Sequence, residues 1–366
     1  MIRGARNHDQ LPDLPMKGRG AVSNRAGRFE THDRVRIDDG WDAAHALPPD
    51  RPPTRVLKDR SRGIISRNTS PDVPFDRSIN PYRGCEHGCV YCFARPTHCY
   101  LGLSAGLDFE THIFAKHDAP ELLKAALARP GYRPRTLALG AVTDPYQPIE
   151  RELRITRAIL EVLWDCRHPV TIVTKSAGVL RDLDILGPMA REGLAKVCLS
   201  ITSLDPKLAR RLEPRASAPE RRLAAVEGLS QAGVPVAVLT APMIPALNDH
   251  ELEALLERSA AAGATSASYV LLRLPLEIAG LFEEWLEAHY PDRRDRVMNL
   301  VRGTRNGKLY DSTWGKRQTG SGVYAKLLAR RFEATVKRLG LNRRSWELKC
   351  GKFRRPRPES PQLALF

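Results

Sequence analysis

The sequence predicts an α/β protein built on a partial (β/α)6 barrel of the TIM type with parallel strands. Short β-branched or apolar runs alternate with segments of helical period, which is the order expected of βαβ units. Runs such as 170–173 are almost continuously apolar, which suits strands buried on both faces of a parallel sheet. The chain supplies about six such units where a closed barrel has eight, so we expect the barrel to stay open.

Taken in order, the predicted strands lie near 78–83 and at 136–142, 169–174, 195–202, 234–241 and 267–272. Segments of helical period separate them at 118–129, 149–166, 179–192, 218–232 and 248–262. In the fourth of these helices, Leu223, Val226 and Leu229 recur at the spacing of one helix face. We assign residues 71–300 to the barrel.

The two ends of the chain have a different pattern. Residues 1–70 hold few periodic apolar positions and many Arg, Asp and Gly residues, which predicts an irregular N-terminal extension lying over the barrel. Residues 301–366 are predicted to form a helical region that ends in a basic tail. From Lys337 onward basic residues far outnumber acidic ones, and several prolines oppose regular structure.

Composition limits the possible classes of function. The chain has 366 residues, 42% of them hydrophobic and 27% charged, which is typical of a globular protein with a sizeable core. Its net charge of +16 favours a polyanionic partner such as nucleic acid. No run approaches the about 18 apolar residues of a membrane span, and no apolar signal-peptide core is present. We therefore expect a cytoplasmic protein with no membrane partner.

Three of the seven cysteines, Cys85, Cys89 and Cys92, fall within eight residues in a C-x3-C-x2-C array, which argues against a disulfide framework. Three thiolates on one short loop can ligate three irons of a [4Fe–4S] cluster and leave the fourth iron open. Gly84 and Gly88 permit the sharp turns that such a loop needs.

Two other sites remain open at this point. A structural zinc site needs four ligands, and Cys99 or His87 would have to complete it. A thioredoxin-type redox site uses only Cys89 and Cys92, and leaves Cys85 unexplained.

Polar residues follow the predicted strands where each one ends. In parallel β/α folds these carboxyl ends form the site of chemistry. The residues at these positions are Cys85, Thr143, Asp144, Lys175, Ser176, Ser200, Thr202, Ala241 and Arg273.

The cysteine array, with Tyr91 before the third cysteine, resembles that of the radical S-adenosylmethionine (SAM) superfamily. This resemblance implies a [4Fe–4S] cluster whose open iron binds the methionyl amino and carboxylate groups of SAM. It also implies reductive cleavage of SAM to a 5′-deoxyadenosyl radical, with a flavodoxin- or ferredoxin-type protein as reductant.

A narrower resemblance covers about Asn80 to Lys326. This part is similar to the spore photoproduct lyase group, the DNA repair photolyase-like branch, and in particular to an uncharacterised bacterial subgroup. The pieces that carry it are Asn80-Pro81-Tyr82-Arg83-Gly84-Cys85, Thr143-Asp144-Pro145-Tyr146, Val173-Thr174-Lys175, Leu199-Ser200-Ile201-Thr202, Glu213-Pro214, Ala241-Pro242 and Trp314-Gly315-Lys316-Arg317.

The resemblance implies SAM contacts at Thr143, Asp144, Lys175, Ser200, Thr202 and Ala241. Asp144 would accept from the methionyl ammonium, and Lys175 would pair with the methionyl carboxylate. Ser200 and Thr202 would bond the ribose or the carboxylate. The Ala241 backbone and Tyr91 would lie on the adenine side.

Two positions depart from the lyase pattern. The hydrogen-donating cysteine is replaced by Ala141, and the tyrosine after the third cluster cysteine is replaced by Phe93. A methyl group and a phenyl ring cannot pass on a hydrogen atom, so we expect no photoproduct reversal. Cys99 and Tyr146 are the candidate catalytic substitutes. Glu213 and Arg215 are expected to pair beside the fourth unit.

We therefore expect radical SAM chemistry, of lyase or oxidoreductase type, on an unidentified substrate. A more specific form of this hypothesis is that the substrate is a nucleic acid, which the protein repairs or modifies. Trp314, Lys316, Arg317 and the basic tail are its predicted binding face. The alternative class is a non-enzymatic iron–sulfur protein for electron transfer or redox sensing.

Overall fold

The computed structural model describes residues 13–35, 52–343 and 346–356. Its main sheet has seven strands in the order β10-β9-β8-β7-β6-β3-β2. The strands are β2 (Ile65–Arg67), β3 (Arg77–Ile79), β6 (Leu137–Leu139), β7 (Val170–Thr174), β8 (Ala195–Ser200), β9 (Val236–Met243) and β10 (Ser266–Leu271). All neighbours pair in parallel except β2, which is antiparallel to β3. The predicted partial barrel is confirmed.

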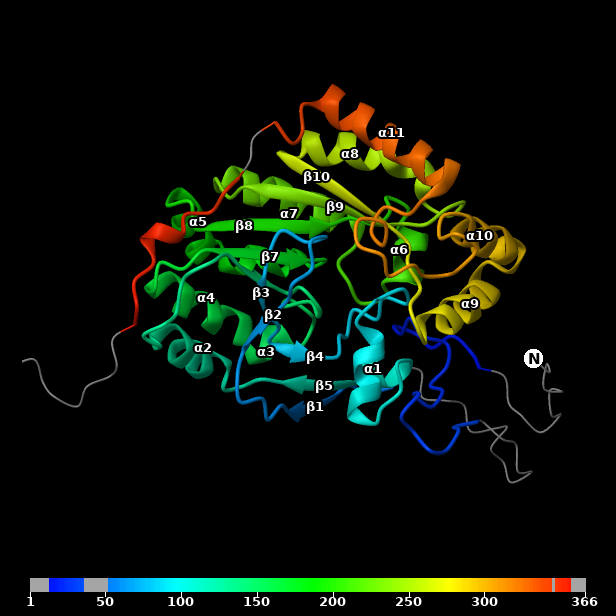
Figure 1. Cartoon of the computed structure of the whole chain (residues 1–366), viewed down its shortest axis with the longest axis horizontal. Coiled ribbons are helices and arrows are strands. Elements are labelled where there is room, and N and C mark those ends of the chain that lie inside the picture. Colours follow the sequence, from blue (N-terminus) through cyan, green and yellow to red (C-terminus); the bar gives the residue numbers. More distant parts are fainter. Residues whose placement is uncertain (1–12, 36–51, 344–345, 357–366) are drawn as a thin grey trace, which may run out of the picture.

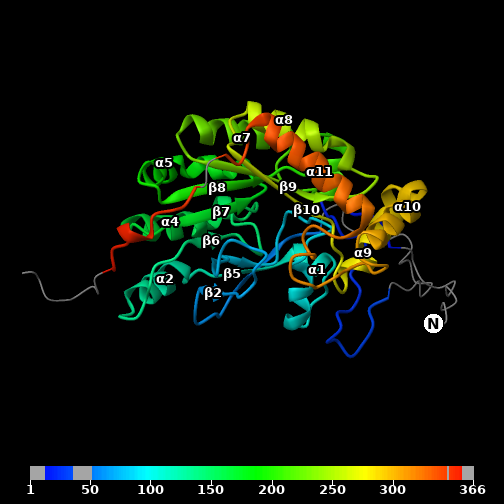
Figure 2. The same ribbon diagram turned by 45° about the horizontal axis from the view of Figure 1, so that its top comes forward.

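Helices cover the outer face of this sheet (Figures 1 and 2). The helices that connect or follow its strands are α2 (Ala119–Ala128), α3 (Glu150–Leu153), α4 (Ile155–Asp165), α5 (Leu183–Arg191), α6 (Pro206–Leu212), α7 (Pro219–Gln231) and α8 (Leu252–Ala261). In α7 the predicted face is buried, because Leu223, Val226 and Leu229 all join the main core. In Figure 2, α7 and α8 lie above β9 and β10, together with α11 (Gly322–Leu339).

Two further helices close the carboxyl side of the sheet. They are α9 (Ile278–His289) and α10 (Pro291–Gly303), and their apolar faces form a second core. Phe282 and Trp285 of α9 pack there with Cys89 and Val90 of the cysteine loop. The loop is therefore sealed by apolar packing, and water is excluded from one side of it.

A second, three-stranded sheet has the order β1-β5-β4. It consists of β1 (Arg55–Lys58), β5 (His112–Ala115) and β4 (Tyr82–Arg83), preceded by the short helix α1 (Leu107–Thr111). The strand predicted near 78–83 is thus divided, with β3 in the barrel and β4 in this smaller sheet. The short strands β1 and β2 also lie in the extension, where the sequence predicted irregular structure.

The N-terminal extension is attached to the barrel through a buried glutamate. Glu110 accepts from the backbone N–H of Gly20 at 2.9 Å and of Ala21 at 2.8 Å. Its carboxylate also pairs with Arg95 at 2.5 Å, and its backbone carbonyl accepts from Arg19 at 2.8 Å. We call residues 16–24 the N-terminal strap. It lies directly on the cysteine loop, because a Cβ added at Gly20 would meet the carbonyl oxygen of Gly88.

The basic tail lies at the opposite end of the barrel from the cysteine loop (Figure 1). Asn342 bonds both backbone groups of Ala267 at the start of β10. Lys349 donates its N–H to Gly193 before β8, and Arg354 donates to Cys166 before β7. The short 3-10 turn η4 (Cys350–Lys352) interrupts this path. The described part of the tail therefore crosses the amino ends of the strands and links them to one another at that end of the barrel.

No helix in the described ranges is long and apolar enough to cross a membrane.

Candidate active site

The cysteine loop, residues 85–92, runs from β4 to the 3-10 helix η1 (Arg95–Leu101). Gly84 and Gly88 take φ values of +79° and +68°, a region that side chains with a Cβ rarely adopt. Turn hydrogen bonds join the Gly88 N–H to the Cys85 carbonyl and the Cys92 N–H to the Cys89 carbonyl. The predicted role of the two glycines as sharp turns fits this geometry.

The side chain of Arg95 binds the backbone of the cysteine loop. Its guanidinium donates to the carbonyls of Cys89 at 2.8 Å and Gly88 at 3.0 Å, and it is completely buried. Because Glu110 neutralises this cation and also holds the strap, one buried ion pair fixes the loop from two sides.

The three thiols lie close enough together to influence one another. Burial, then Asp144 and the other two thiols, raise the pKa of Cys85. Burial and the Glu213 carboxylate likewise raise the pKa of Cys89, while Lys175 acts in the opposite direction. Within the described residues, no group of three or more His, Cys, Asp and Glu side chains has the geometry of a site for a metal ion.

Asp144 is held by four hydrogen-bond donors. One oxygen accepts from the Thr174 hydroxyl at 2.7 Å and the Tyr146 N–H at 2.8 Å. The other accepts from the Lys175 N–H at 2.7 Å and lies 3.3 Å from His87 Nδ1. Burial alone would raise the pKa of Asp144, but His87, the Lys175 amide and Thr174 together lower it to about 2.

A carboxylate has about four acceptor positions, so the carboxylate of Asp144 is saturated in this structure. Its main visible role is to join the end of β6 to the end of β7. Contact with a methionyl ammonium stays a prediction, and it requires one of the four donors to give way.

Lys175, at the carboxyl end of β7, faces the cysteine loop. Its ammonium lies 5.8 Å from the centre of the Tyr91 ring. Burial acts to lower the pKa of Lys175, but Cys89 and Glu213 outweigh burial and raise it. The lysine is therefore held in its charged form beside the thiols, as pairing with an anion requires.

Glu213 anchors a buried network under Tyr91 and Lys175. It accepts from the Tyr91 hydroxyl, from the Arg222 guanidinium and from the Thr202 hydroxyl, the last at 2.6 Å. Arg222 also donates to the Ser200 carbonyl at 3.0 Å. The structure thus brings Tyr91, Thr202 and Ser200 together at one edge of the sheet.

The expected Glu213–Arg215 pair is wrong. Glu213 pairs with Arg222, whereas Arg215 pairs with Glu86 of the cysteine loop at 2.8 Å. The reason is that Arg222 lies on α7 and reaches the buried carboxylate, while Arg215 is half-exposed and contacts Glu86 and Thr54 instead.

Thr143 and Ala241 are placed beside this network by backbone contacts. The buried Thr143 hydroxyl donates to the Tyr82 carbonyl at 2.7 Å. The Ala241 carbonyl accepts from the Thr202 hydroxyl at 3.1 Å. Both residues lie at strand carboxyl ends, and their predicted SAM contacts stay predictions.

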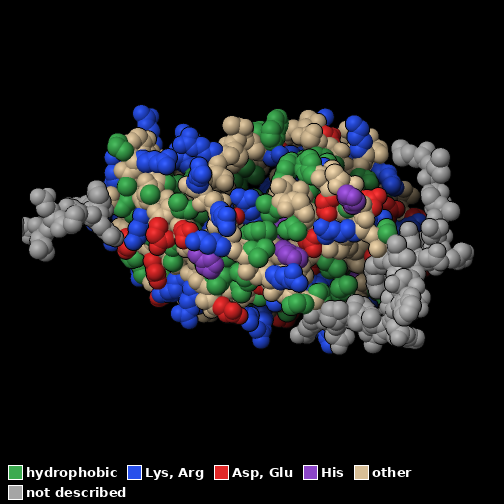
Figure 3. Space-filling model, turned by 90° about the horizontal axis from the view of Figure 1, so that it is seen from below, with side chains coloured by type: hydrophobic (Ala, Val, Ile, Leu, Met, Phe, Trp, Pro, Cys, Tyr) green, Lys and Arg blue, Asp and Glu red, His purple; other side chains and the backbone are tan. Residues whose placement is uncertain are grey.

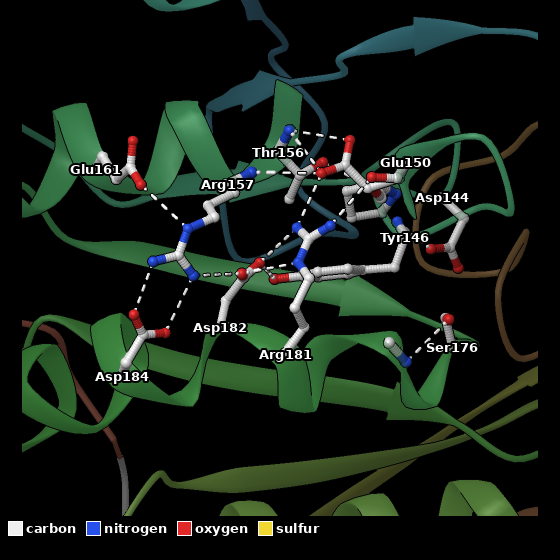
Figure 4. A network of polar contacts seen from close by, with 12 residues as sticks. Asp144, Tyr146, Glu150, Thr156, Arg157, Glu161, Ser176, Arg181, Asp182 and Asp184 are labelled. Carbon is white, nitrogen blue, oxygen red and sulfur yellow. Dashed lines mark hydrogen bonds and ion pairs between the residues drawn. The ribbon is translucent and has the colours of Figure 1, made fainter. Parts of the chain in front are cut away.

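Tyr146 points away from Asp144, into a network of ion pairs on the outer side of the sheet (Figure 4). Its hydroxyl donates to Asp182 at 3.0 Å, and burial followed by the Asp182 charge raises its pKa. Asp182 in turn binds Arg157 and Arg181. This position braces η2 (Ala177–Asp182) against α4, and the hydroxyl is not directed toward the cysteine loop.

Cys99 is buried in η1 in an apolar cluster with Ala21, Ala105 and Leu281. Its sulfur lies against the N-terminal extension just after the strap, since a Cβ at Gly27 would come within 2.8 Å of it. Burial and then Glu277 raise its pKa, so the thiol is held protonated. The structure therefore does not bring Cys99 to the three-thiol group, and its proposed catalytic role rests on the sequence alone.

Glu86, Arg95 and Glu110 hold the loop, and none of the three was expected to do so from the sequence. Most of their partners lie far along the chain, as Arg19 does from Glu110 and Arg215 from Glu86, so no local spacing marks them. The signal that could have been used is their charge. Arg95 follows the third cysteine of the array by three residues, and Glu110 follows Phe109 in the segment before β5.

The fold and the site define an open parallel barrel that carries a loop of three neighbouring cysteines beside the carboxyl ends of its strands. Comparison with known proteins agrees, because residues 79–258 match the Radical SAM superfamily. The chain belongs to this superfamily, and so to the SAM-dependent radical enzymes.

Other proteins are similar to this chain in sequence or in fold. An uncharacterized protein of Mycobacterium tuberculosis is 38% identical over 232 residues, which is 63% of this chain and 68% of the relative. An uncharacterized protein of Methanocaldococcus jannaschii is 28% identical over 247 residues, covering 67% of this chain and 87% of the relative. Solved spore photoproduct lyase shares the fold with a TM-score of 0.55 at 18% identity, covering 78% of this chain and 80% of that chain.

Proposed function

We propose that Cys85, Cys89 and Cys92 ligate three irons of a [4Fe–4S] cluster, and that the chain cleaves SAM reductively to act on a substrate by hydrogen abstraction. When bound, the reduced cluster supplies the electron that splits SAM into methionine and a 5′-deoxyadenosyl radical. The observation that carries the proposal is the proximity of the three thiols of one short loop to one another and of Lys175 to two of them, close enough for each to shift the pKa of its neighbours.

The residues present fit such a cluster. Burial and the neighbouring carboxylates raise the pKa of Cys85 and Cys89, and a bound cluster would supply the positive charge that ionises them. The Asp144 backbone also forms a hydrogen bond with Cys85, which favours the thiolate. Hydrogen bonds to the ligand sulfurs are one of the means by which proteins tune such clusters.

Lys175 and the Glu213 network would hold SAM. The ammonium of Lys175 would pair with the methionyl carboxylate, while Tyr91 is fixed by Glu213 and presents its ring to the same space. Because Glu213, Arg222 and Thr202 are bonded to one another, the binding surface is organised before a ligand arrives.

The Lys175→Ala variant is expected to bind SAM about 10- to 100-fold more weakly, because a charge-assisted bond contributes about 1.5–3 kcal/mol. Titration calorimetry on the reconstituted protein measures this loss, with iron content as the check that the loop is intact. Lys196→Ala, near the opposite end of the neighbouring strand β8, is the matched control. Equal SAM affinity in the Lys175 variant and the wild type would show that Lys175 does not bind SAM.

For the substrate we propose a nucleic acid, supported by the +16 charge and by Trp314. Trp314 is 53% exposed, and the Arg317 guanidinium lies 4.3 Å from the centre of its ring. An exposed aromatic side chain beside a cation suits stacking on a base. Lys and Arg side chains are also spread over the face shown in Figure 3, with Asp and Glu among them. Photoproduct reversal is not part of the proposal, since Ala141 and Phe93 replace the hydrogen-atom relay.

The residues of the basic face expected from the sequence lie at two separate places in the structure. The tail lies at the amino ends of the strands, whereas Trp314 and Arg317 follow α10, which closes the carboxyl side.

We expect the affinity for DNA or RNA to decrease as salt is added. A plot of log affinity against log salt concentration should have a slope of about −0.9 for each phosphate contacted on duplex. Trp314→Ala should weaken binding, while Lys352→Gln in the tail should leave it unchanged. Salt-independent binding, or none to either nucleic acid, would contradict this proposal.

A further inference from the structure

Arg273 is a half-buried arginine that lies just past the carboxyl end of β10. Within the described ranges, no carboxylate forms an ion pair with its guanidinium and no side chain or carbonyl accepts a hydrogen bond from it. Burial is the largest cause that lowers its pKa and the Arg317 charge acts in the same direction, while Tyr310, Cys92 and Asp72 act in the opposite direction. A charge taken partly out of water without a partner destabilises a protein, so this position calls for an explanation.

The neighbouring cations differ from Arg273 because protein groups accept hydrogen bonds from them, although the Nε of Arg305 is buried without an acceptor among the described residues. Arg305 donates to four backbone carbonyls, those of Leu271, Leu272, Lys316 and Arg317, at 2.9–3.0 Å. Arg317 pairs with Asp72 at 2.5 Å and donates to Ser70. These contacts hold the loop after α10 against the end of β10, and they leave Arg273 as a cation with its donors unused among the described contacts.

Arg273 is also placed beside the cysteine loop. Its guanidinium lies 4.8 Å from the centre of the Phe93 ring, and Phe93 directly follows Cys92. Phe93 is 44% exposed, although it belongs to a loop that is otherwise mostly buried. Stacking uses the flat face of a guanidinium and leaves the N–H donors at its edge available for a planar anion.

We propose that Arg273 is a substrate-binding residue that holds an anionic group of the substrate, a phosphate or a carboxylate, next to the cysteine loop. Phe93 fixes the plane of the guanidinium, and the engaged Arg305 and Arg317 keep the surrounding potential positive. The anion supplies the missing partner of Arg273. This inference rests on the proposed radical SAM function and specifies the chemistry of its substrate.

The test uses the full-length reconstituted protein with two probes, pyrophosphate for the phosphate class and citrate for the carboxylate class. Titration calorimetry compares the wild type with Arg273→Gln and Arg273→Lys. Arg330→Gln is the control, because Arg330 is exposed on α11 and has no ion pair within the described residues. Iron content and SAM affinity are measured on every variant, so that failure of the cluster assignment is seen separately from failure of the anion site.

At least one probe is expected to bind the wild type and to lose about 10- to 100-fold in affinity in Arg273→Gln, with iron and SAM binding unchanged. The probe that shows the loss identifies the class of anion. Arg273→Lys should retain part of the affinity because it keeps the charge without the planar donors. Equal affinities in Arg273→Gln and Arg330→Gln would overturn the proposal. Abolition of the binding by saturating SAM would overturn it as well, since the anion would then be the methionyl carboxylate.

Discussion

Replacing Cys85, Cys89 or Cys92 with alanine is expected to abolish the iron–sulfur absorbance of reconstituted protein near roughly 400 nm, or to leave it labile. Three protein ligands are the minimum for a cluster with one open iron, and within the described residues no fourth cysteine lies with the three thiols. Iron analysis and absorbance spectra after anaerobic reconstitution measure the effect.

Cys166→Ala and Cys198→Ala are the controls for that experiment. Cys166 caps the end of α4 and Cys198 lies within β8, and neither is near the cysteine loop in sequence or packing. Both variants should keep the iron content of the wild type. A variant lacking all three loop cysteines that still held about four irons per chain would refute the assignment.

Glu110→Gln is expected to destabilise the folded protein by about 3–5 kcal/mol, because removing one partner leaves the buried Arg95 uncompensated. Both carboxylate oxygens of Glu110 accept from donors: one from Ala21 N–H and Arg95, the other from Gly20 N–H. In either orientation, the new amide group would therefore turn its own donors toward a donor. The loss should release the N-terminal strap from the cysteine loop.

Urea unfolding monitored by circular dichroism measures this change in the free energy of unfolding. The control is Glu121→Gln, an exposed glutamate on α2, which should stay within about 0.5 kcal/mol of the wild type. A Glu110→Gln protein as stable as this control would show that the buried ion pair does not hold the strap.

The barrel was predictable because its signals are local. Strands such as β7 are rich in β-branched and apolar residues, and α7 places its apolar residues on one face, so local pattern alone locates them. The division of the first strand into β3 and β4 was not predictable, since it depends on pairing with β5, which lies about 30 residues further along the chain.

The cysteine loop and Lys175 were predictable from residue type and spacing, and the structure places them together. The groups that hold them were not, because Glu110–Arg95 and Glu213–Arg222 are buried pairs formed by tertiary packing. The basic tail shows the same limit. Its composition suggested a nucleic-acid face, yet backbone bonds from Lys349 and Arg354 tie it to the amino ends of the strands.

The most direct measurement of the central claim is the formation of 5′-deoxyadenosine when the reconstituted protein is reduced anaerobically with SAM present. The proposed function predicts this product from the wild type, much less of it from Lys175→Ala at low SAM concentration, and none from Cys89→Ala. A protein that holds its cluster and accepts electrons, yet forms no 5′-deoxyadenosine above the Cys89→Ala background, would contradict the claim and identify an iron–sulfur electron carrier instead.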